Sequence, residues 1–134
     1  MVPPRLRFWF VVHFVADIFF AIPLILAPEM LLRPLGWTVV DPVVSRVVGA
    51  ALVGIGGESL LGRHADLASF RTMLRLKILW SGATIVGLIL SIGQGAPWGA
   101  WLFLAIFLCF CGLWIYWAGR LGQIAASTNA SAST

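Results

Sequence analysis

The sequence predicts an all-α fold: a bundle of four transmembrane helices with both termini in the cytoplasm. Of the 134 residues, 60% are hydrophobic and only 10% are charged, whereas a soluble domain carries about 25% charged residues. A mean hydropathy of +0.99 therefore indicates that lipid covers most of the surface. Four apolar runs also reach the length of about 20 residues that a membrane-crossing helix needs. Finally, Lys and Arg are unevenly distributed between the connecting segments, which predicts the orientation.

The first two predicted helices lie in the N-terminal half of the chain. The first covers about residues 8–26 and is longer than the apolar core of a signal peptide, about 7–15 residues, so we expect it to be retained. The second covers about residues 43–61. Asp41 is placed to cap its free amide groups, and Pro42 is tolerated at a helix start. The apolar loop between these helices contains Trp37 and is too short to span, so we expect it at the outer membrane interface.

The third and fourth predicted helices cover about residues 74–92 and 98–118, separated by the Gly- and Pro-containing turn 93–97. Residues 1–122 thus form a single membrane-embedded domain. The segment 123–134 is rich in Ala, Ser and Thr, and its composition predicts a disordered polar tail.

Basic residues are concentrated on one side of the predicted spans. That side holds seven of the nine Lys and Arg residues: Arg5, Arg7, Arg63, Arg71, Arg75, Lys77 and Arg120. The other side holds Arg33 and Arg46. Because cytoplasmic loops carry the excess of positive charge, both termini are predicted to be cytoplasmic, in a bacterial inner membrane. The same bias accounts for the net charge of +4, so no nucleic-acid partner is predicted.

Asp17 is the most informative candidate site residue, because it lies near the middle of the first apolar run. It is about ten residues, or roughly 15 Å, from the inner end of that helix. A carboxylate at this depth must be protonated, paired or reached by water. His13 lies four residues earlier and therefore on the same helix face.

Further polar residues of the second and third helices reach a similar depth. Glu58 and Lys77 lie near the inner ends of their helices, and Ser81 and Thr84 share a face with Lys77. If these faces converge with the first helix, they form a polar pocket that opens toward the cytoplasm and is closed by Asp17. Glu58 would then pair with Lys77, and Asp17 with His13 or a serine, because buried ions need partners.

Each of these residues also has a purely structural interpretation. Lys77 could extend its ammonium group to the inner headgroups, and Glu58 could hold two helices together through a basic neighbour. His13 could be a neutral packing residue, and Asp17 a protonated clamp between helices. Arg46 could reach the outer headgroups or bond to carbonyl groups of the first helix or the outer loop.

The remaining motifs predict packing rather than chemistry. Cys109 and Cys111 are two residues apart on a helix and do not face each other. The chain has no Cys-x-x-Cys motif, no His pair at metal spacing and no phosphate loop, so neither a cofactor nor a metal is predicted. The second helix carries two stripes of small residues, Ser45/Gly49/Gly56 and Ala50/Gly54/Gly57. Such stripes allow close helix packing within one chain or in a homo-oligomer.

A series of short motifs runs from the outer loop into the second helix: Pro28-Glu29, Leu35-Gly36-Trp37, Asp41-Pro42, Arg46-Val47-Val48-Gly49 and Gly54-Ile55-Gly56. This pattern resembles the DoxX-like group of small four-helix bacterial membrane proteins over roughly residues 1–120. The resemblance implies a compact four-helix bundle. It also implies varied functions, some tied to quinone-linked oxidation complexes, and it carries over no catalytic residue.

Three functions are compatible with the sequence. The first is a binding or accessory subunit that holds a lipid-like or quinone-like ligand between the first three helices or supports partner membrane subunits. The second is a proton-coupled small-molecule transporter with Asp17 as the coupling carboxylate. The third is a membrane enzyme that uses His13, Asp17 and Glu58 as acid–base groups; an enzyme is the less expected class.

Overall fold

The computed structural model describes the backbone of residues 1–132 and the side chains up to residue 127, and this part of the chain is all-helical. The elements in order are α1 (Pro4–Leu26), α2 (Pro28–Leu32), α3 (Pro42–Leu61), the 3-10 turn η1 (Gly62–His64), α4 (Leu67–Gly93) and α5 (Gly99–Ala132). Four of these helices, α1, α3, α4 and α5, are long and apolar enough to cross a membrane. The prediction of an all-α fold with four long apolar helices is therefore confirmed.

Helices α4 and α5 extend beyond their predicted limits. Helix α4 begins at Leu67, because Asp66 caps it: the carboxylate Oδ1 accepts a hydrogen bond from the Ser69 amide at 2.8 Å. Helix α5 continues through residues 123–132, so the predicted disordered tail is helical as far as it is described. Its alanines favour helix, and no Gly or Pro interrupts it after Gly122. Residues 133 and 134 lie outside the described part of the chain.

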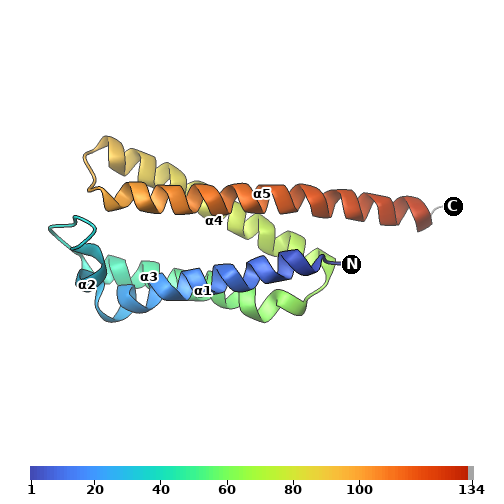
Figure 1. The fold of residues 1–134 in the computed structure, drawn as a ribbon, viewed down its shortest axis with the longest axis horizontal. Helices are drawn as coiled ribbons and strands as arrows, with labels where there is room; N and C mark the ends of the chain where they lie inside the picture. Colours follow the sequence, from blue (N-terminus) through green and yellow to red (C-terminus); the bar gives the residue numbers. More distant parts are fainter. Residues whose placement is uncertain (133–134) are drawn as a thin grey trace.

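The four long helices pack as two pairs, α1 with α3 and α4 with α5, which form two layers (Figure 1). The α1–α3 contact depends on glycine. A Cβ atom at Gly56 would lie 2.7 Å from the Cβ of Asp17, and one at Gly49 would lie 2.7 Å from Cγ1 of Ile25. The first small-residue stripe therefore packs within the chain, whereas a Cβ atom added at Gly54 or Gly57 of the second stripe would meet no other part of the described structure within 4 Å.

An aromatic core joins the two layers near the end where α1 begins, called here the N-terminal end of the bundle. The rings of Phe10 and Phe70 are 4.7 Å apart, and those of Phe10 and Trp114 are 5.6 Å apart. All three side chains are fully buried. Leu6, Leu74 and Leu121 also belong to this core, together with Val2, Met73 and Trp117, so the N-terminal end is closed.

The opposite end is joined by the loop after α2. Leu35 accepts a hydrogen bond from the Gly99 amide at 3.0 Å, at the start of α5. Trp37 turns inward and packs against Phe103 of α5, with 6.0 Å between ring centroids. The chain between α1 and α3 thus contains the short helix α2 and then folds back to connect the two layers.

Candidate functional site

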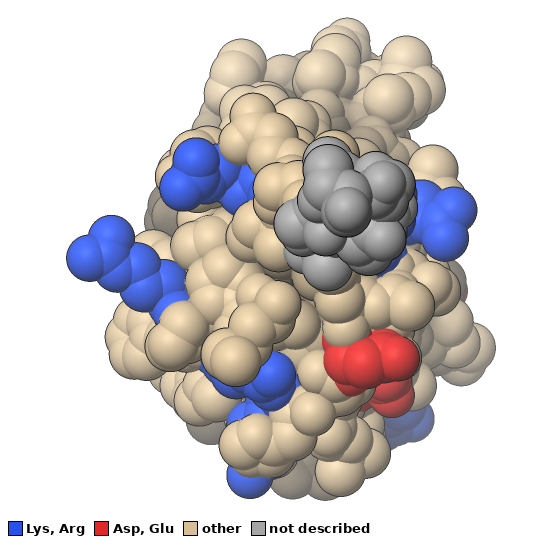
Figure 2. All heavy atoms as spheres, turned by 90° about the vertical axis from the view of Figure 1, so that its right-hand side faces the viewer, with Lys and Arg blue, Asp and Glu red and all other residues tan. Residues whose placement is uncertain are grey.

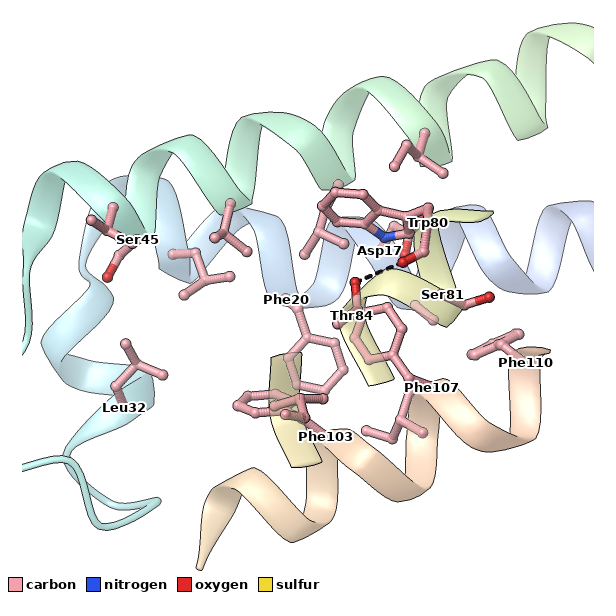
Figure 3. A pocket seen from close by; sticks show the side chains of 18 of the residues that line it. Asp17, Phe20, Leu32, Ser45, Trp80, Ser81, Thr84, Phe103, Phe107 and Phe110 are labelled. Carbon is pink, nitrogen blue, oxygen red and sulfur yellow. Dashed lines mark hydrogen bonds between the residues drawn. The ribbon is translucent and has the colours of Figure 1, made fainter. Parts of the chain in front are cut away.

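A cavity of about 540 Å³ lies between the two layers. Its walls are mostly aromatic and aliphatic, and they come from all four long helices and the loop after α2. Phe20 of α1, Trp80 of α4, and Phe103 and Phe107 of α5 face this space (Figure 3). The cavity is therefore a predominantly apolar chamber inside the bundle.

Charged groups occupy one region of the cavity wall. Lys77 donates a hydrogen bond to the hydroxyl of Ser59, and its Nζ lies 3.2 Å from Nδ1 of His13. The same Nδ1 lies 2.9 Å from Oδ2 of Asp17. These four residues are all buried. We call His13, Asp17, Ser59 and Lys77 the polar cluster.

The ring nitrogen Nδ1 of His13 lies between an ammonium group and a carboxylate. In a neutral imidazole this nitrogen carries either a hydrogen or a lone pair, so it can donate to Asp17 or accept from Lys77 but not both. Despite the 2.9 Å separation, Oδ2 of Asp17 has no aligned hydrogen-bond donor among the described residues. The geometry thus corresponds to a His13 whose Nδ1 accepts a hydrogen bond from Lys77. If Nδ1 gained a proton, it would instead donate a hydrogen bond to Asp17.

Aromatic rings surround the cation of the polar cluster. Nζ of Lys77 lies 5.0 Å from the ring centre of Phe10 and 5.3 Å from that of Trp114. The His13 ring meets Phe110 edge-on, with 4.8 Å between centroids. Because aromatic faces attract cations, these rings partly replace the water that Lys77 loses on burial.

Ser81 and Thr84 line the cavity beside the polar cluster, on the helix face that they were predicted to share with Lys77. Their hydroxyl groups donate to their own helix: Ser81 to the Lys77 carbonyl at 2.6 Å, and Thr84 to the Trp80 carbonyl at 2.9 Å (the dashed line in Figure 3). Each hydroxyl oxygen thus keeps lone pairs with which it can accept a further hydrogen bond.

Two predictions about this site are wrong. Glu58 is exposed and makes no ion pair with Lys77; the next residue, Ser59, takes its place. Lys77 is 3% exposed, so its ammonium group does not extend to the headgroups. Ser59 could have been found by continuing the stripe Ser45, Gly49, Leu52, Gly56 along α3, because its spacing keeps it on the buried face. Glu58 is one residue away and thus about 100° around the helix.

The predicted direction of the pocket is also wrong. His13, Glu58 and Lys77 were expected to lie at an entrance on the side of the chain termini, but the aromatic core closes the N-terminal end. The cavity instead extends from His13 and Lys77 toward Trp37 and Asp41 at the opposite end. The depth of a residue, estimated from its position in the sequence, could not predict the direction of the cavity. It contains no information on where the two helix pairs separate.

Arg46 lies outside the cavity. Its Nε donates to the carbonyl of Ile25 at 3.1 Å, which satisfies a free carbonyl at the C-terminal end of α1. This contact is one of the alternatives that the sequence left open for Arg46, a bond to a carbonyl group of the first helix. Among the described residues, no group of three or more His, Cys, Asp and Glu side chains comes together as a metal site.

Comparison with known proteins returned no match to this chain among protein-family models, curated proteins or solved structures. The resemblance to the DoxX-like group therefore stays a prediction.

Proposed function

We propose that this protein is an integral membrane protein that binds an apolar, lipid-like or quinone-like molecule in the cavity between its two helix pairs. The observation that carries the proposal is the cavity itself: about 540 Å³, apolar along its walls, with a buried polar cluster in one region. Ligand sites typically have volumes of about 300–1,000 Å³, apolar linings and a few fixed polar groups. A bundle that only needed to be stable would fill this space with side chains.

The proposal includes a location and an orientation. The N-terminal end carries most of the basic residues of the chain, and basic side chains surround this face in Figure 2. The positive-inside rule then places both termini in the cytoplasm of a bacterial cell. The cavity lies on the outer side of the polar cluster in this orientation. Membership of the DoxX-like group, and a role as a subunit of a larger membrane complex, belong to the same proposal.

Two neighbouring valines of α3 allow a matched test of the cavity. Val48 lines the cavity, whereas Val47 is 64% exposed and does not line it. Val48→Trp should place an indole group in the cavity and displace the ligand, while Val47→Trp adds the same group to the lipid-facing side. Each variant is purified in nanodiscs, and the co-purifying small molecules are extracted and quantified by mass spectrometry.

We expect a ligand that co-purifies with the native protein and with Val47→Trp but is reduced about tenfold or more in Val48→Trp, a loss of about 1.4 kcal/mol in binding. Equal amounts of the molecule in both variants would show that it binds elsewhere. Repeated isolation of the native protein with no bound molecule and no partner subunit would contradict the proposal.

A proton-coupled transporter is the second candidate, and the shared Nδ1 of His13 favours it. The exchange of partners at this nitrogen requires one proton to move next to a cavity that could hold a substrate. Substrate addition should then release protons from the native protein but not from Asp17→Asn. Unchanged transport in Asp17→Asn would exclude this candidate.

The enzyme alternative loses its third residue in the structure. Glu58 lies on the exposed side of α3 and does not line the cavity, so the trio His13, Asp17 and Glu58 is not assembled. We therefore do not propose an acid–base reaction.

A further inference from the structure

The cavity reaches the outside of the molecule along α3, a helix that makes few contacts with α4. Val44 and Val48 of α3 line the cavity and are also 59% and 40% exposed, so they form part of its rim. On the opposite side of the cavity, between α1 and α5, the rings of Phe20 and Phe103 pack together with 5.7 Å between their centroids. The rest of the exposed rim is formed by Val39 and Asp41 of the preceding loop. Because α3 is long and apolar enough to cross a membrane, the side of the rim formed by Val44 and Val48 faces hydrocarbon. A molecule that enters on this side must first dissolve in the bilayer.

The charges of the polar cluster balance each other. Lys77 and Asp17 contact the same atom of His13, at 3.2 and 2.9 Å, so their charged groups lie within about 6 Å of each other and interact strongly in a low dielectric. Transfer of a proton from Lys77 to Asp17 would neutralise both groups, so the pair has no net charge in either arrangement. A charged ligand head would therefore be desolvated without gaining an opposite charge.

Hydrogen-bonding groups at the same wall present both an acceptor and a donor. Asp17 and Thr84 supply acceptor oxygens, because the Thr84 hydroxyl hydrogen is already used by its own helix. Trp80, which also lines the cavity, carries an indole N–H that can only donate. Figure 3 shows Asp17, Trp80 and Thr84 next to one another on the cavity wall. A hydroxyl group can donate to one of them and accept from another, whereas a carbonyl can only accept.

We infer that the ligand is an uncharged amphiphile with a hydroxyl head, a long-chain alcohol or a phenol with an apolar tail, which enters from the bilayer along α3. Its hydroxyl lies against Asp17, Trp80 and Thr84, and its tail follows the aromatic walls. This inference rests on the proposed function and specifies its ligand class. Phospholipids are excluded, because their charged headgroup would have to reach the middle of the bundle.

The test compares probes that differ only at the head. Native protein in phosphatidylcholine nanodiscs is equilibrated with 12-bromododecan-1-ol, 12-bromododecanoate or 1-bromododecane, and bound probe is counted by native mass spectrometry through its bromine isotope pattern. Val48→Trp, with its blocked cavity, gives the background. We expect the alcohol to bind about tenfold tighter than the alkane and the carboxylate, a difference of about 1.4 kcal/mol.

Two variants test whether Thr84 and Asp17 of the cavity wall cause the preference for the alcohol probe. Thr84→Val should reduce alcohol binding but leave alkane binding unchanged. Thr72→Val is its control, since Thr72 is an exposed threonine of the same helix that also bonds to its own backbone. Asp17→Asn removes the charge that balances Lys77, so it should shift the preference toward the carboxylate.

The outcomes separate the two levels of the proposal. Tighter binding of the carboxylate by the native protein, or equal binding of all three probes above the Val48→Trp background, would overturn the ligand class and leave the cavity function standing. Binding of every probe at the background level would contradict the cavity function itself.

Discussion

Two faces of α3 contain similar residue types but have different surroundings. The face toward α1 contains Gly56 and Ser59, both buried, and the backbones approach so closely that a Cβ at Gly56 would lie 2.7 Å from Asp17. The face away from α1 contains Gly54 and Glu58, which have open space or exposure around them. Glycine and a polar residue therefore stabilise the bundle only where a second helix lies against them. The difference can be tested with pairs of substitutions, one on each face.

The largest effect is expected for the glycine pair. Gly56→Leu would push a side chain into Asp17 and separate α1 from α3, so we expect loss of the folded protein; ordinary overpacking costs about 1–3 kcal/mol. Gly54→Leu should be tolerated, because nothing lies within 4 Å of its Cβ position. Size-exclusion profiles and thermal unfolding in detergent measure both. Similar behaviour of the two variants would show that the α1–α3 contact is less close than described.

The next effect concerns the cation that bridges α4 to this contact. Lys77→Met leaves Asp17 without its opposite charge, and breaking a buried pair costs about 3–5 kcal/mol. Adding Asp17→Asn removes the unbalanced charge, so the double variant should regain much of the loss. A double-mutant cycle of unfolding free energies measures this coupling. Additive losses would indicate that the two charges do not interact.

A smaller effect is expected for the neighbouring polar pair. Ser59→Ala removes one of the two acceptors of Lys77, the other being Nδ1 of His13, and hydrogen bonds to charged groups contribute about 1.5–3 kcal/mol. Glu58→Gln changes an exposed group that forms no hydrogen bond or ion pair within the described part of the chain, so the stability of this variant should stay within about 0.5 kcal/mol of the native protein. Chemical denaturation in mixed micelles compares the two. A larger loss for Glu58→Gln would restore the pairing that the sequence predicted.

The smallest effect is a pH dependence at the start of α4, outside the buried contacts. Hydrogen bonds from Ser69 hold the pKa of Asp66 below its ordinary value of 3.8. A lowered pKa in the folded state means that this cap stabilises the protein fully above pH 3.8, and that the contribution disappears as the pH falls through the lower folded pKa. The midpoint temperature of thermal unfolding should therefore decrease less steeply between pH 6 and pH 2 in Asp66→Asn than in the native protein. The asparagine keeps a hydrogen-bond acceptor but does not titrate. Parallel curves would contradict the role of this cap.

The fold was largely predictable from the sequence because a membrane imposes a simple requirement. Each span must be long, apolar and helical, and these properties can be counted along the chain. Asp41 was also recognisable as a cap, and its Oδ1 accepts from the amide of Val43 at 2.8 Å. The lengths of α4 and α5 were underestimated. High hydropathy marks only the apolar part of a helix, whereas its hydrogen bonds continue into the more polar residues at its ends.

The site was predictable in part. Periodicity placed His13 with Asp17, and Lys77 with Ser81, on common faces, and the structure brings these two faces together. It could not choose between Glu58 and Ser59, because that choice depends on how α3 is rotated about its axis. Depth along a helix can be read from residue numbers, but rotation and the separation of helix pairs are set by packing, to which distant residues such as Phe10 and Gly99 contribute.

The opening along α3 changes what concentration means for this protein. A ligand that arrives through the side of the bundle is dilute or concentrated with respect to lipid, not water. Each methylene of its tail favours the bilayer over water by about 0.8 kcal/mol. A longer tail therefore raises the concentration of ligand in the membrane more than it raises the affinity of the cavity for ligand that is already in the membrane. Occupancy will then follow the mole fraction of ligand in the membrane, and adding empty lipid will strip the protein even when the total amount of ligand is unchanged.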